Sequence, residues 1–209
     1  MLLPIAGYNP MGKESVLERI KELKALKAED LISETLLEVN AEISSKVFPE
    51  IHVVLNLADD IGGSWSNKCT VDYTSKFNIG PLVKRRFCTP YFWCSEAFTK
   101  EKIVSRTLEY AYRTLFWIDI GQPKSLKDLI HQETYVASKT SSKREAMAGE
   151  NLKKAKEYFN QRSESEDYSV LFNFFYGDAA SAALNYPTFG ASEDQGFLFA
   201  HHLSKTMSP

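Results

Sequence analysis

Long hydrophobic runs are missing from this sequence of 209 residues. No stretch approaches the roughly 18 uninterrupted apolar residues that a membrane-spanning helix requires, so we expect no membrane partner. The opening segment, MLLPIAGYNPMGKESV, has only a short apolar run, which Pro4 and Gly7 interrupt, and it carries no basic leader. We therefore expect no signal peptide and a cytoplasmic location.

The chain also has few cysteines and a small net charge. The three cysteines, Cys69, Cys88 and Cys94, form no CxxC pair, which favours a reducing compartment over a disulfide framework. Twenty-five basic and 27 acidic residues leave a formal net charge of -2. Because so small a charge gives no long-range attraction for a polyanion, we expect no nucleic-acid partner.

Known catalytic and metal-binding spacings are absent as well. The four histidines fall into neither HExxH nor a zinc-site spacing, so no metal site is predicted. The segment GGSW, residues 62–65, is neither a P-loop nor a GxGxxG fingerprint. None of these patterns identifies a characterised family, and the cofactor, if there is one, stays unknown.

Apolar residues are plentiful in shorter, periodic patterns. Hydrophobic residues make up 44% of the chain and charged residues 25%, which is typical of a globular protein. The length suits one core, so we predict a single domain over residues 1–209. Apolar residues at helical spacing predict amphipathic helices over residues 15–26, 31–47, 99–120, 126–136 and 144–161.

Two short apolar segments predict buried strands. The segments IHVVLNL (51–57) and PYFWC (90–94) are rich in β-branched or aromatic residues and have strand length. We predict a helix-rich α/β or α+β fold with two or three buried strands, at about 50–57 and 89–95, packed with four to six amphipathic helices. Helices between consecutive strands favour parallel pairing, which brings the carboxyl ends of both strands to one edge.

Polar residues follow both predicted strands. Asp59 and Asp60 come after the first strand, and Ser95 and Glu96 come after the second. Ligands of open α/β sheets collect beyond the carboxyl ends of the strands. We therefore predict a pocket there for a small polar or anionic molecule, with Asp60 or Glu96 as the catalytic base if chemistry occurs. The sequence leaves open whether the protein is an enzyme.

Other side chains complete this predicted pocket. Lys68 and Arg86 would offset negative charge on the ligand, and Trp65 and Trp93 would form its walls. Asp59 and Trp65 also suit plainer roles, in a turn and as an anchor from loop to core. The predicted ligand-binding residues are Asn56, Asp59, Gly63, Trp65, Asn67, Lys68, Arg86, Trp93 and Ser95.

Two alternatives remain open from the sequence. In the first, the protein is a noncatalytic interaction module, in which the aromatics of 172–176 with Phe197 and Phe199 form an exposed patch for a partner or for a homo-oligomer. In the second, it is a hydrolase that uses Cys94 or the paired acids Asp59 and Asp60, for which the sequence identifies no partner base.

Overall fold

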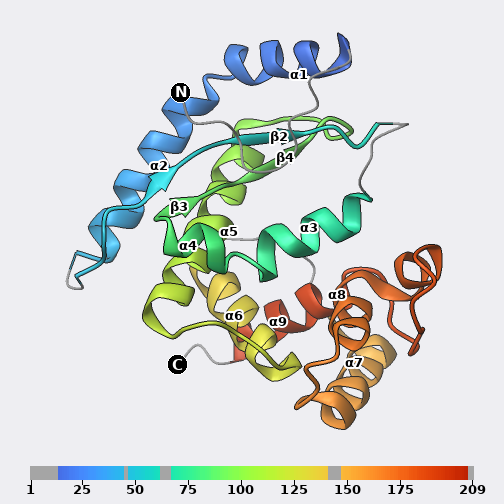
Figure 1. Ribbon diagram of the computed structural model, residues 1–209. Helices are drawn as coiled ribbons and strands as arrows, with labels where there is room; N and C mark the ends of the chain where they lie inside the picture. Colours follow the sequence, from blue (N-terminus) through green and yellow to red (C-terminus); the bar gives the residue numbers. More distant parts are fainter. Residues whose placement is uncertain (1–13, 45–46, 62–66, 141–146, 207–209) are drawn as a thin grey trace. The chain divides into compact units, whose positions relative to one another are not determined.

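The structure is a computed structural model that describes residues 14–44, 47–61, 67–140 and 147–206. The chain divides into two compact units, Met1–Ile118 and Asp119–Pro209, which are described in turn. The described residues form nine helices and two short pairs of parallel strands (Figure 1). The prediction of a helix-rich fold with parallel strands is confirmed, but the predicted number of four to six helices is too low. Whether residues 1–209 act as one domain stays a prediction.

The first unit contains five of the helices. The two helices predicted before the first strand are present. Two more helices follow between the strands, in a region where the sequence pattern is only moderately helical. The longest helix starts one residue after Thr99, where it was predicted. These helices are α1 (Glu14–Ala25), α2 (Ala28–Glu42), α3 (Lys68–Phe77), α4 (Gly80–Lys84) and α5 (Lys100–Asp119).

Both strand segments pair in parallel. β1 (His52–Val53) pairs with β3 (Phe87–Cys88), and β2 (Asn56–Ala58) pairs with β4 (Tyr91–Trp93), with Ala58 opposite Trp93. The first predicted strand is thus split into β1 and β2, whereas the second predicted segment contains β4 alone and β3 lies just before it. Pro90 lies between β3 and β4 and has no N–H to donate to the ladder, although its carbonyl oxygen still accepts the N–H of Asn56 at 2.9 Å.

Helices cover both faces of the strands. Phe92 packs with Leu23, Ile32 and Ile103 of α1, α2 and α5. On the opposite face Tyr91 and Trp93 pack with Ala58, Cys88 and Tyr110, and Val71 of α3 packs against this cluster. Figure 1 shows α1 and α2 on one side of the strands and α3 on the other. Because successive strand side chains point to opposite faces, the aromatic run YFW serves both layers.

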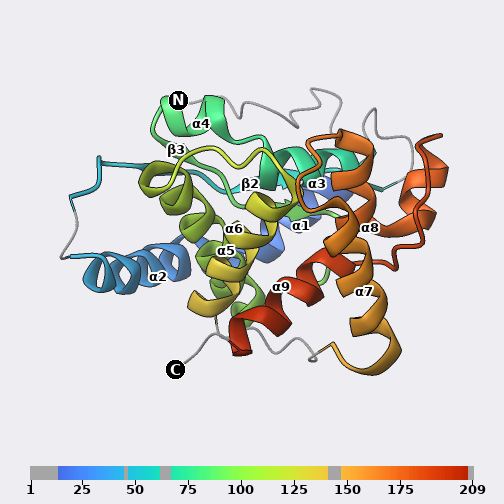
Figure 2. The same ribbon diagram turned by 90° about the horizontal axis from the view of Figure 1, so that it is seen from below.

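The second unit consists of helices. They are α6 (Leu126–Lys139), α7 (Gly149–Arg162), α8 (Tyr168–Ala183) and α9 (Gln195–Thr206). Ser125 and Asp128 form the capping box that the sequence predicted at the start of α6. α9 packs against α6, α7 and α8 (Figure 2). In the described part of the chain, no helix has both the length and the apolar character that crossing a membrane demands.

The aromatic residues of the C-terminal segment lie in the interior of this unit. Phe172, Phe174 and Phe175 are fully buried, and Phe197 and Phe199 are nearly so. The exposed aromatic patch that the interaction-module alternative requires is therefore absent at these described positions. The sequence of α8 shows no polar stripe, because residues 170–177 are all buried and such a stretch lacks the amphipathic period.

A turn at Gly177 and Asp178 holds the loop between α8 and α9. Gly177 interrupts the helix with φ 83° and ψ 175°. The carboxylate of Asp178 accepts the backbone N–H groups of Phe189, Gly190 and Ala191 at 3.1–3.2 Å and the side-chain amide of the buried Asn173 at 2.9 Å. One carboxylate thus fixes the return of the chain towards α9.

Candidate functional site

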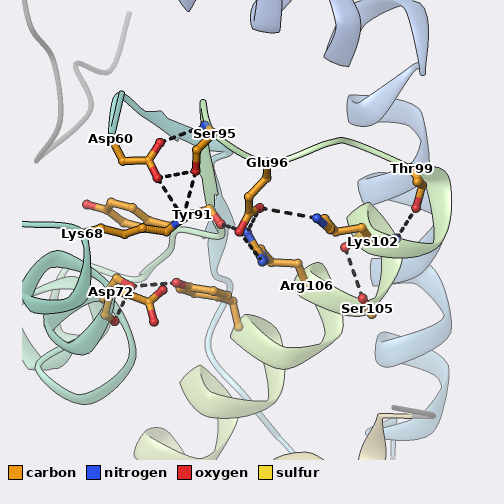
Figure 3. Close-up of polar contacts among 12 residues, drawn as sticks. Asp60, Lys68, Asp72, Tyr91, Ser95, Glu96, Thr99, Lys102, Ser105 and Arg106 are labelled. Atoms are coloured by element: carbon orange, nitrogen blue, oxygen red, sulfur yellow. Dashed lines mark hydrogen bonds and ion pairs between the residues drawn. The ribbon is translucent and has the colours of Figure 1, made fainter. Parts of the chain in front are cut away.

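Three polar side chains meet at the carboxyl ends of β2 and β4. The carboxylate of Asp60 accepts hydrogen bonds from the Ser95 backbone N–H at 2.9 Å and from the Ser95 hydroxyl at 2.5 Å. The Lys68 ammonium donates to Ser95 Oγ at 3.0 Å and lies 2.8 Å from Asp60 Oδ2. Figure 3 shows the three side chains pointing towards one another. We call Asp60, Lys68 and Ser95 the strand-end cluster.

Local structure positions each member of the strand-end cluster. Lys68 is the first residue of α3, and Asn67 caps that helix by accepting the N–H of Thr70. The Lys68 ammonium lies 5.5 Å from the centroid of the buried Trp93 ring, which is a cation–π distance. Asn67 and Trp93 therefore act by orienting Lys68.

The strand-end cluster keeps Asp60 ionised. Burial raises the pKa of this carboxyl, but the hydrogen bonds from Lys68 and Ser95 outweigh burial and hold the pKa below its usual value. The Asp60 side chain is only 4% exposed, whereas that of Lys68 is 43% exposed. The buried Asp60 carboxylate thus positions the other two groups, and the Lys68 ammonium and the exposed Ser95 hydroxyl face solvent.

Glu96 belongs to a neighbouring ion pair. Its two carboxylate oxygens accept the guanidinium of Arg106 at 2.7 and 3.1 Å, and Lys102 lies 4.0 Å away (Figure 3). Arg106 also donates to the carbonyl of Tyr91 at 3.0 Å, which ties α5 to β4. Because Arg106 binds Glu96 through both oxygens, this carboxylate supports the turn after β4.

Sequence reasoning missed Arg106 and Lys102. They are four residues apart on a helix that the sequence did predict, so they share one face of α5. That spacing could have marked them as a basic pair. Their acidic partner, ten residues before Arg106, could not be read from the spacing because it lies outside the helix.

The other predicted residues lie at varying distances from the strand-end cluster. Asn56 is buried, and its side chain hydrogen-bonds the phenol of Tyr91. Asp59 accepts the N–H of Ile61 at 3.0 Å, as in a turn. Gly63 and Trp65 lie outside the described residues. Arg86 precedes β3, at the amino end of the strand pair, so the structure does not bring it to the cluster.

The cysteine chemistry considered from the sequence has little support in this geometry. Cys94 is fully buried, and burial, with Asp59 and Asp60 nearby, raises the pKa of its thiol to about 11. A thiol in that state holds almost no thiolate at neutral pH. Among the described residues, no group of three or more His, Cys, Asp or Glu side chains comes together as a metal site.

Replacing Asp60 by asparagine should lower the free energy of unfolding by about 1 kcal/mol, because the partly exposed ion pair with Lys68 is lost. The folded pKa of Asp60 is below its unfolded value, so its contribution is present above pH 3.8 and is lost as the pH falls through the folded pKa. Urea unfolding at pH 7 and pH 3 measures both effects. Asp59→Asn, which keeps the turn acceptor, is the control and should change stability less.

The strand-end cluster offers a ligand one ammonium, one polarised hydroxyl and the inner carboxylate that holds them. Donors of this kind suit an anionic or hydroxyl-bearing molecule better than an apolar one. The chain matches no protein-family model, no curated protein and no solved structure.

Proposed function

We propose that the strand-end cluster binds a small polar or anionic molecule. The observation that carries this proposal is the position of the Lys68 ammonium, which two contacts hold at the carboxyl ends of a parallel strand pair while the side chain stays partly exposed. An ammonium has three N–H donors. Asp60 and Ser95 use two of them, which leaves a third for a ligand.

Binding is better supported than acid–base catalysis. A general base works best with a pKa near the working pH, and Asp60 has a lowered pKa. Glu96 is held by Arg106 through both oxygens. The two carboxylates named as catalytic bases thus act in this proposal as supports for the ligand's binding groups, and an enzymatic role stays a separate hypothesis.

The charges around the turn after β4 are nearly balanced, which limits the ligand class. Three positive side chains contact this turn, those of Lys68, Lys102 and Arg106. The carboxylates of Asp60 and Glu96 neutralise two of these three charges. Little long-range attraction results, so affinity would come from short-range hydrogen bonds. A compact molecule with one anionic group, or with several hydroxyls, fits that balance.

An NMR titration tests the proposal. Inorganic phosphate and the neutral polyol sorbitol serve as probes, and the backbone amides of Asn67, Lys68 and Ser95 report binding. We expect saturable shifts with at least one probe. Lys68→Met should weaken binding about tenfold or more, because it removes a charged donor.

Lys100→Met is the matched control for this titration. It removes the same charge from an exposed position at the start of α5, outside the strand-end cluster. Binding should stay within about twofold of wild type, because charges on the surface are screened by salt. Absence of saturable shifts with both probes, or equal weakening by the two substitutions, would contradict the proposed site.

We also propose that the protein works in a reducing, cytoplasmic setting. All three cysteines are free, and two of them are buried. The alternative of an interaction module has less support, because the aromatics that were to form its surface are buried. Partial proteolysis before and after reduction would test the redox setting, with no change expected.

A further inference from the structure

We infer that a second ligand site lies beside the carboxyl-terminal half of α3 and takes a small organic anion with an apolar body. The site is an open cavity of about 350 Å³ between α3, α4 and the segment that carries β3 and β4. Cavities of this size suit molecules of one ring or a short branched chain. This inference is independent of the strand-end cluster.

The floor of the cavity is apolar and has its polar atoms satisfied. Val71, Leu82 and Tyr91 supply the apolar surface. The hydroxyl of Ser75, which also lines the cavity, pairs with Tyr110 at 2.7 Å, and the phenol of Tyr91 is bonded to Asn56. Because these groups already have partners, the floor favours the hydrocarbon part of a ligand.

The rim carries polar side chains that are available to a ligand. Thr74, Asn78 and Thr89 line the cavity, and within the described part of the chain the structure gives their side chains no hydrogen bond. Arg85 lines it too and is exposed, with its guanidinium 5.8 Å from the ring of Phe87. These groups are the few convergent polar contacts that orient a ligand in a largely apolar pocket.

Arg85 decides the charge of the ligand. Among the described residues that line the cavity it carries the single formal charge, and no carboxylate lines it. The end of α3 turns its last carbonyl groups towards this region, which disfavours an anion near Asn78. The anionic group therefore binds at Arg85, whose planar guanidinium matches a carboxylate or a phosphate, and the apolar body lies over Val71 and Tyr91.

Three probes separate the parts of this inference. Phenylacetate has the anionic group and the ring, 2-phenylethanol has the ring alone, and acetate has the anionic group alone. In an NMR titration we expect phenylacetate to shift the amides of Val71, Thr74, Leu82 and Thr89 saturably. Each of the other two probes should bind about tenfold more weakly or worse, because it lacks one of the two contacts.

Substitutions then assign the charge to one side chain. Arg85→Gln should weaken phenylacetate about tenfold and leave 2-phenylethanol within about twofold. Lys84→Gln removes the neighbouring positive charge from an exposed residue that does not line the cavity, and should have little effect. Leu82→Trp narrows the cavity and should weaken both aromatic probes. Amide spectra of each variant check that it is folded.

Three results would overturn the inference. The first is the absence of saturable phenylacetate shifts at these four amides in the wild-type protein. The second is equal binding of phenylacetate and 2-phenylethanol, and the third is an equal loss in Arg85→Gln and Lys84→Gln. Either of these would mean that the cavity does not select an anion through Arg85. The reporting amides and probes differ from those of the strand-end cluster, so failure at one site leaves the other unaffected.

Discussion

Replacing Asp178 by alanine is expected to lower the free energy of unfolding by about 2–3 kcal/mol. The carboxylate receives three consecutive backbone N–H groups from the loop before α9 and the amide of the fully buried Asn173. Hydrogen bonds to a charged acceptor are stronger than neutral ones, and here one acceptor serves four donors. When the carboxylate is removed, the N–H of Ala191 and the side-chain amide of Asn173 lose this acceptor, and both residues are buried.

The conservative variant Asp178→Asn separates charge from geometry. It keeps one oxygen acceptor, so we expect a smaller loss at pH 7. Burial raises the pKa of Asp178, but its hydrogen bonds from Asn173 and the loop outweigh burial and lower it. The charge therefore stabilises the folded state above the ordinary value of 3.8 and ceases to do so as the pH falls through the folded pKa. The gap between wild type and Asp178→Asn should close in acid, and a constant gap would contradict this.

The tryptophans allow this experiment to follow the units separately. Trp65, Trp93 and Trp117 all precede Asp119, so tryptophan fluorescence reports on the first unit. Far-ultraviolet circular dichroism reports on the helices of both. If residues 1–209 unfold as one domain, Asp178→Ala should shift both urea transitions equally. A shift in dichroism alone would mean that the second unit unfolds by itself. Glu193→Gln, an exposed acid near the loop, is the control.

Gly177→Ala is expected to cost about 3 kcal/mol or more, or to prevent folding. A Cβ atom at this position would lie 2.8–2.9 Å from backbone atoms of Ser192 and Glu193, which cannot rotate away as a side chain could. The backbone angles, φ 83° and ψ 175°, fall in a region that is essentially restricted to glycine. Conformational strain and steric overlap thus act together.

Gly190→Ala isolates the strain from the overlap. Gly190 also has a positive φ, 87°, but a Cβ built there meets no described atom within 4 Å. We expect this control to cost about 1 kcal/mol, the conformational term alone. Urea unfolding followed by circular dichroism compares the two. Equal losses would show that the close approach of Ser192 and Glu193 to Gly177 is not the cause.

Local patterns in the sequence were enough for several parts of the fold. The Ser125 and Asp128 pair predicted the start of α6, and apolar spacing predicted α5, because capping and amphipathic period depend on residues close in the chain. The same reasoning failed for α8. Residues 170–177 of α8 are buried one after another, and such a stretch carries no amphipathic period.

The strand-end cluster shows where such reasoning stops. Strand length and the helices between the strands correctly predicted that 51–57 and 90–94 run in parallel, which brings Asp60 near Ser95 across 35 residues. The same argument grouped Glu96 with them, and Arg86 was added to the predicted site for its positive charge. In the structure Glu96 forms an ion pair with Arg106, and Arg86 lies at the amino end of the strands.

The sequence by itself determined the helices that have a clear amphipathic period or cap, and that the two strand segments run in the same direction, because these patterns depend on residues close together in the chain. It did not determine α8. Only the tertiary structure decided which charges pair, that Asp60 is held ionised by Lys68 and Ser95, and that the C-terminal aromatics are internal. The physical reason is that hydrogen bonds and ion pairs act over a few ångströms. The packing of segments distant in the sequence determines which groups come this close, and the spacing of residues along the chain does not predict it.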